Sequence, residues 1–176
     1  MNLFQGEEIR VNVRIMVRRD FAEVQSIEES CFEFPWTEQE FLSCLQQPNC
    51  LGLVAECEGK IAGFLIYEMS KGGTFITNIA VDPALQRHNI ARQMIQKLVT
   101  KMLTRQTRKL VIEIRETNLS ALLCFRALGF RASNVLKNFY EGQNEDAYVL
   151  QYRLGKELAL PVYTSSAGRL SELIAG

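Results

Sequence analysis

The spacing of apolar residues along the chain predicts an ordered succession of strands and helices. Stretches that alternate apolar with polar residues, or that are continuously apolar between turn residues, predict strands. Apolar residues spaced three and four apart predict helices. The predicted strands are 11–17, 51–57, 61–69, 74–81, 109–115, 130–139 and 147–154, and the predicted helices are 20–31, one beginning at 37, 90–102 and 119–128. The expected element order is βααβββαβαββ.

Capping and turn residues set several of these boundaries. Asp20 is expected to cap the first helix, with Glu23 reaching back to it. Thr37 and Glu40 have the spacing of a capping box, which predicts a sharp start of the second helix. The turn Glu58-Gly59-Lys60 joins two strands, and its glycine allows the positive φ of a hairpin turn.

The element order predicts an α+β fold, with a mixed, mostly antiparallel sheet of about seven strands flanked by four helices. Antiparallel strands come first because short turns join them, and one βαβ crossover follows, centred on the loop at 82–90. The pattern ends near residue 154. We therefore expect one domain over 1–154 and an appended C-terminal extension over 155–176.

Charge and cysteine usage narrow the possible functions. Lys plus Arg and Asp plus Glu each number 20, so no net charge draws the chain toward nucleic acid or anionic membranes. No apolar run approaches the roughly 18 residues of a membrane span, and residues 1–10 lack the apolar core of a secretory signal. The five cysteines include no CxxC pair, which indicates reduced thiols in a cytoplasmic protein. The single His88 rules out a multi-histidine metal site, so no metal is expected.

The segment QRHNIA at 86–91 joins a predicted strand to the start of a helix. Such a junction offers free backbone N–H groups and the positive end of the helix dipole to an anion. Asn89 tolerates a left-handed φ, Ala91 is small, and Arg87 and Arg92 add positive charge. The spacing alone favours a plainer alternative, an ordinary connection with solvated arginines.

The same segment resembles the Gln/Arg-x-x-Gly-x-Gly/Ala motif of the GNAT superfamily of N-acetyltransferases. Asn89 replaces the first glycine of the motif, and Ala91 is an accepted variant of the second. The surrounding residues in family order are NIAVDP at 78–83, Glu113, Asn118 and LGF at 128–130. FPWT at 34–37, NFY at 138–140 and EDA at 145–147 resemble the RimI-like ribosomal-protein-alanine N-acetyltransferases. The resemblance covers roughly residues 11–154.

This resemblance implies the GNAT acyl-coenzyme A N-acyltransferase fold and acetyl transfer from acetyl-coenzyme A (acetyl-CoA) to an amine. The backbone at 79–81 would pair with the pantetheine arm, with an N–H facing the thioester oxygen, and the amides of 87–92 would hold the pyrophosphate. The implied coenzyme-binding residues are Ile79, Ala80, Val81, Arg87, His88, Asn89, Ile90, Ala91, Arg92, Asn118 and Phe125. For Asn118, a plain helix N-cap is a compatible alternative.

The resemblance implies that Glu113 is the general base, acting directly or through a water, and Glu113 lies in the otherwise apolar strand segment Leu110–Ile114. We expect its carboxylate to be buried, and burial raises a carboxyl pKa toward the range that a base for an ammonium substrate requires. The alternative is a structural ion pair with Arg115 or Arg131.

At the position of Phe125, the RimI-like enzymes have a tyrosine that protonates the coenzyme thiolate. Phenylalanine cannot donate a proton. Three explanations remain open: Tyr140 supplies the proton, water supplies it because a thiol has a pKa of about 8.5, or efficient catalysis is lost.

Two aromatic segments are expected to form the walls of a peptide groove. Phe139-Tyr140 resembles the Tyr-Tyr pair that borders the groove in the RimI-like group, and Phe34 and Trp36 lie in the loop expected opposite. For Trp36, the alternative is a hydrophobic staple against Phe41.

The leading functional hypothesis is acetyl transfer to the N-terminal α-amine of a protein, such as a ribosomal protein, by a monomer or weak dimer. One alternative is a GNAT enzyme for lysine or a small amine. Another is a catalytically weak module for acyl-CoA binding or protein interaction. Phe125 and Asn89 support this alternative because they depart from the family pattern.

Overall fold

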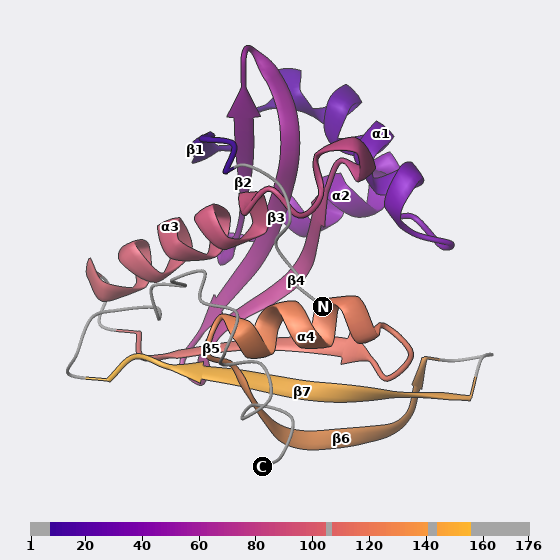
Figure 1. Cartoon of the computed structure of the whole chain (residues 1–176), viewed down its shortest axis with the longest axis vertical. Coiled ribbons are helices and arrows are strands. Elements are labelled where there is room, and N and C mark those ends of the chain that lie inside the picture. Colours follow the sequence, from indigo (N-terminus) through magenta and orange to yellow (C-terminus); the bar gives the residue numbers. More distant parts are fainter. Residues whose placement is uncertain (1–7, 105–106, 141–143, 156–176) are drawn as a thin grey trace.

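Seven strands form one mixed sheet in the described part of the protein, which comprises residues 8–104, 107–140 and 144–155 of a computed structural model (Figure 1). The strand order is β1-β2-β3-β4-β5-β7-β6, and every neighbouring pair is antiparallel except β4 and β5. The strands are β1 (Asn12–Ile15), β2 (Cys50–Cys57), β3 (Lys60–Ser70), β4 (Gly73–Val81), β5 (Lys109–Arg115), β6 (Arg131–Tyr140) and β7 (Glu145–Arg153). The helices are α1 (Phe21–Cys31), α2 (Glu38–Leu45), α3 (Ile90–Thr104) and α4 (Leu119–Ala127), with short 3-10 turns η1 (Arg18–Asp20) and η2 (Pro83–Leu85). The predicted α+β class and element order are confirmed.

Each face of the sheet carries its own hydrophobic core. Successive side chains of a strand point to opposite faces, so a strand covered on both sides is apolar throughout. On β2 and β3, Leu53 and Leu65 face the core beneath α3 and α4, whereas Val54 and Phe64 face the core beneath α1 and α2. The continuous apolar runs in the sequence therefore reflect a sheet between two helical layers.

The N-cap predicted from the sequence is confirmed for α2 and is wrong for α1. Thr37 accepts a hydrogen bond from the Glu40 N–H, and the Glu40 carboxylate accepts one from the Thr37 N–H, as a capping box requires. Asp20 does not cap α1 with its side chain, so that prediction is wrong. Its buried carboxylate binds the Arg14 guanidinium at 2.7 and 2.9 Å instead, and Glu23 accepts a bond from the Ile61 N–H. Both carboxylates thus join the helix to the sheet.

The sheet divides between β4 and β5. These strands pair only over Thr74–Ile76 and Leu110–Ile112, after which β4 continues beside β3 and β5 continues beside β7. Figure 1 shows the two halves of the sheet diverging from this short parallel contact. Among the described strands, none pairs with the edge of β4 on the β5 side from Thr77 to the end of β4.

A β-bulge at Thr77 lies where the divergence begins. Ile76 pairs with Tyr67 and Asn78 pairs with Ile66, so Thr77 is the extra residue. A bulge bends its strand and reverses the alternation of faces beyond it. Accordingly, Ile76 lies in the core beneath α3, whereas Ala80 lies in the core beneath α1 and α2.

β7 is the last strand along the described chain, and Leu154 follows it as a buried residue whose N–H donates to the Arg108 carbonyl. The predicted C-terminal extension lies outside the described residues from 156 onward. Among the helices of the described residues, none has the length and apolar character needed to cross a membrane.

Candidate active site

A cavity of about 320 Å³ occupies the space between the diverging strands. The predicted site residues that line it are Phe34, Trp36, Ile79, Glu113, Asn118, Phe125 and Tyr140. Its lining also includes Glu28, Thr77 and Asn78, which had no predicted catalytic or binding role. Ala80, Val81, Phe139 and the loop at 87–92 are not part of this lining. The fold thus gathers residues from 28 to 140 of the chain at one point.

Glu113 lines the cavity and is exposed, so the prediction of a buried carboxylate is wrong. Leu110, Ile112 and Ile114 point into the core beneath α3 and α4, which directs Glu113 to the other face. On that face α1 and α2 pack mainly against β2, β3 and β4, which leaves this part of β5 uncovered. Partial desolvation within the cavity still raises the pKa of the Glu113 carboxyl.

The ion pairs proposed as an alternative role for Glu113 are not formed. Arg115 pairs with Glu145 at 2.9 Å, and Arg131 donates to the Phe130 carbonyl at 3.0 Å. Among the described residues, no salt bridge involves Glu113. Its carboxylate is therefore available to a ligand in the cavity.

Tyr140 lies at the end of β6 and also lines the cavity. The Arg115 guanidinium sits over its ring, 4.2 Å from the centroid, and fixes the ring by a cation–π contact. Burial raises the pKa of the Tyr140 phenol; the charge of Arg115 lowers it, and that of Glu113 raises it. The phenol therefore stays protonated at neutral pH, as a proton donor must.

The β6–β7 hairpin holds Tyr140 through an irregular stretch of strand. Leu136 pairs with Ala147 and Tyr140 pairs with Glu145, so three residues of β6 face Asp146 alone. The Asp146 carboxylate accepts bonds from the Asn138 N–H at 3.0 Å and from the Lys137 ammonium. Asn138 has a φ of +50°, a conformation that asparagine tolerates better than most residues. Together these features redirect the end of β6 toward the cavity.

Helix α4 brings its first turn and one aromatic side chain to the opposite side of the cavity. The Asn118 side chain accepts a hydrogen bond from the Ala121 N–H at 3.1 Å, so the N-cap interpretation is confirmed. Phe125 is buried and packs edge-to-face on Phe130, with ring centroids 5.0 Å apart. The position of the missing tyrosine thus adjoins the cavity but carries no hydroxyl.

The loop between α1 and α2 forms the aromatic wall. Phe34 is 62% exposed, and Trp36 packs edge-on against Phe41 with centroids 5.3 Å apart, as the staple predicts. Helix α1 binds both backbone groups of Trp36: its N–H donates to Glu28 at 2.8 Å, and its carbonyl accepts from Gln25 at 2.8 Å. The wall is therefore fixed to α1 rather than loosely hinged.

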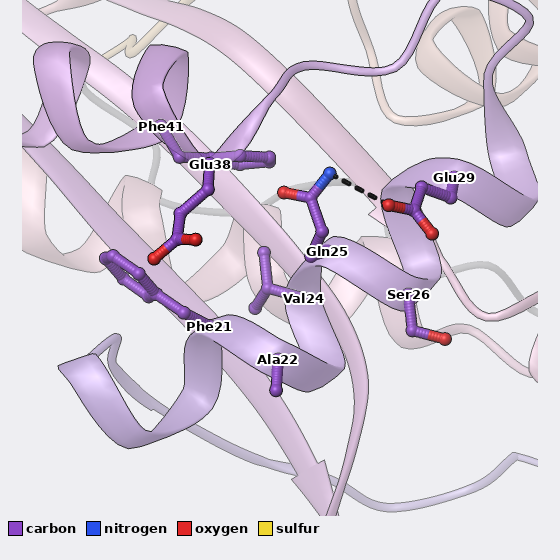
Figure 2. A pocket seen from close by; sticks show the side chains of 8 residues that line it. All are labelled: Phe21, Ala22, Val24, Gln25, Ser26, Glu29, Glu38 and Phe41. Carbon is purple, nitrogen blue, oxygen red and sulfur yellow. Dashed lines mark hydrogen bonds between the residues drawn. The ribbon is translucent and has the colours of Figure 1, made fainter.

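Gln25 belongs to a second pocket, which lies between α1 and α2. Figure 2 shows its amide group directed toward Glu29, with Phe21 and Glu38 on the other side of the pocket. None of the predicted site residues lines this pocket. This pocket is connected to the candidate site through Gln25, because the Gln25 amide also donates to the Trp36 carbonyl.

Glu28 is the site residue that the sequence analysis missed. It is 1% exposed, and its two carboxylate oxygens accept bonds from the Trp36 N–H at 2.8 Å and the Asn78 amide at 3.0 Å. Burial raises the pKa of the Glu28 carboxyl. The signal was present, because Glu28 falls one helical turn after Val24 on the apolar face of α1. A carboxylate at such a position points to a polar contact inside the molecule.

The loop before α3 contains two residues in the left-handed region. Arg87 and Asn89 have φ values of 71° and 64°, so the left-handed conformation expected for Asn89 is confirmed. The His88 Nδ1 lies 2.9 Å from the Gln86 carbonyl, and the Ile90 side chain is buried. Because the Ile90 side chain is buried, any contact of Ile90 with a ligand would be made by its backbone.

The end of β4 joins this loop to the cavity. The Val81 carbonyl accepts hydrogen bonds from the Gln86 amide at 3.2 Å and the Cys31 thiol at 3.3 Å. The N–H of the adjoining Asp82 donates to the Ala62 carbonyl. These contacts hold the loop at one end of the unpaired edge of β4 and leave Ile79 at the cavity.

Comparisons with known proteins identify the family. Residues 21–130 match the acetyltransferase (GNAT) family. The chain is 30% identical over 133 residues to the ribosomal protein bS18-alanine N-acetyltransferase of Escherichia coli K12, covering 74% of this chain and 89% of the relative. The crystal structure of the Escherichia coli ribosomal-protein-S18-alanine N-acetyltransferase matches with a TM-score of 0.75 at 26% identity, over 88% of this chain and 99% of that one.

A more distant structure shows the same fold. It is a putative streptothricin acetyltransferase from Bacillus anthracis in complex with acetyl coenzyme A, with a TM-score of 0.68 at 14% identity, covering 82% of this chain and 99% of that chain. The chain thus belongs to the acetyltransferase (GNAT) family. It is an N-acetyltransferase similar to the RimI-like enzymes, as the sequence motifs predicted.

Replacing Glu28 with glutamine should loosen the Trp36 wall. Both partners of Glu28 are N–H donors, and glutamine offers one accepting oxygen while placing an NH₂ group against the other donor. An unsatisfied buried donor costs roughly 1–3 kcal/mol. Because Trp36 is the only tryptophan, we expect red-shifted fluorescence emission and easier quenching. Glu58→Gln in the exposed turn between β2 and β3 is the control, and equal spectra for both variants would contradict the clamp.

Proposed function

We propose that this N-acetyltransferase moves acetyl from acetyl-CoA to the N-terminal α-amine of a protein, with Glu113 as general base and Tyr140 as general acid. The supporting observation is the single cavity that brings Glu113, Tyr140 and the Trp36 wall together. The names of the relatives, which specify alanine of a ribosomal protein, favour a ribosomal protein as the acceptor.

The edge of β4 and the loop at 87–92 suit the proposed coenzyme. On the side away from β3, no described strand lies beside 79–81, so this backbone edge can pair with an extended amide-bearing chain such as pantetheine. The left-handed residues Arg87 and Asn89 orient N–H groups for a pyrophosphate at the start of α3. When bound, acetyl-CoA supplies an acetyl group activated as a thioester.

In this proposal, Glu113 takes the proton from the acceptor ammonium, directly or through a water. An α-ammonium has a pKa of about 8, so a carboxyl with a raised pKa lies closer to it than an ordinary glutamate does. Glu113 is exposed to the cavity, and its carboxylate charge favours entry of a cationic amine.

A backbone N–H of β4 and the Tyr140 phenol carry out the two remaining steps, which are stabilisation of the thioester oxygen and protonation of the thiolate. An N–H on the unpaired edge near Ile79 stabilises the negative charge that develops on the thioester oxygen. Tyr140 donates its proton to the departing thiolate, taking the role of the hydroxyl that Phe125 lacks. The Arg115 contact holds the phenol in place for this transfer.

A cytoplasmic location is proposed with this function. All five cysteines are free thiols, as expected for a protein of a reducing compartment. The monomer or weak dimer expected from the sequence stays a prediction.

The acceptor class is tested with peptides. We expect acetylation of peptides with free N-termini, alanine-first sequences among the best, and little acetylation of the same peptides when the N-terminus is blocked and lysines are free. Product mass spectrometry identifies the acetylated position. Preference for lysine in the blocked set would assign the enzyme to the lysine or small-amine class instead.

The role of Glu113 is tested by its pH dependence. Protonation inactivates a carboxylate base, so the wild-type rate should rise as the pH passes the raised pKa of Glu113. Glu113→Gln should lower kcat by about 10²–10⁴ at neutral pH and by less at high pH, where the amine is already neutral. Glu116→Gln, a neighbouring exposed carboxylate, is the control. Identical pH–rate profiles for the wild type and Glu113→Gln would exclude Glu113 as the base.

The proton donor is tested by exchanging the two aromatic positions. Tyr140→Phe should lower kcat by about 10²–10⁴. Adding Phe125→Tyr to that variant should restore part of the rate, because residue 125 lines the same cavity. Tyr148→Phe on β7 should leave kcat unchanged. A wild-type kcat for Tyr140→Phe would assign the role to water.

The loop is tested by the effect of acetyl-CoA on the melting temperature. Saturation at a hundred times Kd stabilises a protein by about 2.7 kcal/mol. Asn89→Gly should keep this shift, whereas Asn89→Val should reduce it, because a β-branched residue disfavours a φ of 64°. As a control, Asn144→Val, also at positive φ (49°), should lower the melting temperature without changing the shift. An undiminished shift for Asn89→Val would contradict the assignment.

A further inference from the structure

Three potential metal ligands from separate elements meet beside the aromatic wall. Cys44 lies near the end of α2, Cys50 begins β2, and Glu68 lies on β3. The two sulfurs are 2.8 Å apart, and the Glu68 Oε1 lies 3.9 Å from the Cys44 sulfur. Their ligand atoms all lie within 4.8 Å of one another. The fold thus brings Glu68 next to two cysteines that precede it by 18 and 24 residues and that form no recognised metal-binding motif in the sequence.

The cluster lies at the margin of the core, with Cys50 buried and both Cys44 and Glu68 half-buried. Cys50 is 3% exposed, and its sulfur has the Cys44 thiol as a polar partner. Burial strongly raises the pKa of the Cys50 thiol, and the neighbouring Cys44 and Glu68 raise it further. A divalent cation bound among the three groups would displace the thiol protons and balance the negative charge of the thiolates that form.

The distances require a modest adjustment to coordinate one ion. Zn²⁺ binds thiolate at about 2.3 Å and carboxylate oxygen at about 2.1 Å, which places tetrahedral ligand atoms roughly 3.6–3.8 Å apart. The sulfur–oxygen distance already has nearly this value. The two sulfurs must separate by about 1 Å, and Cys44, half-buried near the end of α2, lines an open pocket.

An open pocket of about 570 Å³ gives access to the cluster. Cys44 and Glu68 line it together with Asn49 and Glu40, and it also touches Trp36 and Thr77. Solvent can therefore reach the side of the cluster away from the core and supply a fourth ligand.

We propose that Cys44, Cys50 and Glu68 bind one Zn²⁺ ion, with a water from the adjoining pocket as the fourth ligand. Thiolates select zinc over magnesium or calcium, and three protein ligands with one open position form a recognised zinc arrangement. The ion would tie α2 to β2 and β3. Because α2 follows the Trp36 loop directly, zinc would stabilise the aromatic wall of the active site without taking part in acetyl transfer.

The test uses the full chain without a histidine tag, purified under a non-thiol reductant and without chelators. Elemental analysis should give close to one zinc per chain. After zinc removal, Co²⁺ should produce a thiolate-to-cobalt charge-transfer band, and Zn²⁺ should raise the melting temperature. Cys44→Ser and Cys50→Ser should abolish the band, and Glu68→Gln should weaken Co²⁺ binding at least tenfold.

Cys57→Ser is the matched control, since Cys57 is a half-buried thiol at the other end of β2. It should keep the zinc, the cobalt band and the thermal shift, and circular dichroism should show that every variant is folded. Absence of both zinc and the cobalt band in the wild type would overturn the proposal. So would equal losses in all cysteine variants, or a Cys44–Cys50 disulfide found under the reducing conditions.

Discussion

The separation of β4 from β5 is the constraint on which the site depends. Parallel pairing stops after Ile76 because the bulge at Thr77 turns β4 away. The same bulge directs Asn78 toward α1 and leaves the next residues of β4 with an unpaired edge. One extra residue therefore creates the cavity, the edge proposed for the coenzyme and the contact that fixes the aromatic wall.

The two sides of the cavity are held by different means. On the side of α1, Glu28 binds both the Trp36 loop and Asn78, so one carboxylate links the aromatic wall to β4. On the side of β6, Arg115 and Asp146 orient Tyr140 through a cation–π contact and a bulged hairpin. The first clamp is buried, whereas the second lies near the margin of the sheet, where Lys137 remains exposed.

Features that depend on neighbouring residues were predictable from the sequence, and features that depend on distant packing were not. The capping box at Thr37 and the left-handed Asn89 follow from local chemistry, and the element order follows from periodicity. The exposure of Glu113 could not be read from its apolar strand, because it depends on which strands the helices cover. The pairing of Glu28 with Asn78, 50 residues away, likewise needed the folded sheet.

The position of Tyr140 has a consequence for how such an enzyme can diversify. β6 is an edge strand that pairs with β7 alone, and most of its side chains face solvent. Phe125, by contrast, is packed among core aromatic rings. A proton donor on the edge strand can be gained, lost or moved by mutation without disturbing the core. In related proteins, the residue that donates the proton can therefore change position on the edge strand while the core of the sheet and α4 keeps its packing.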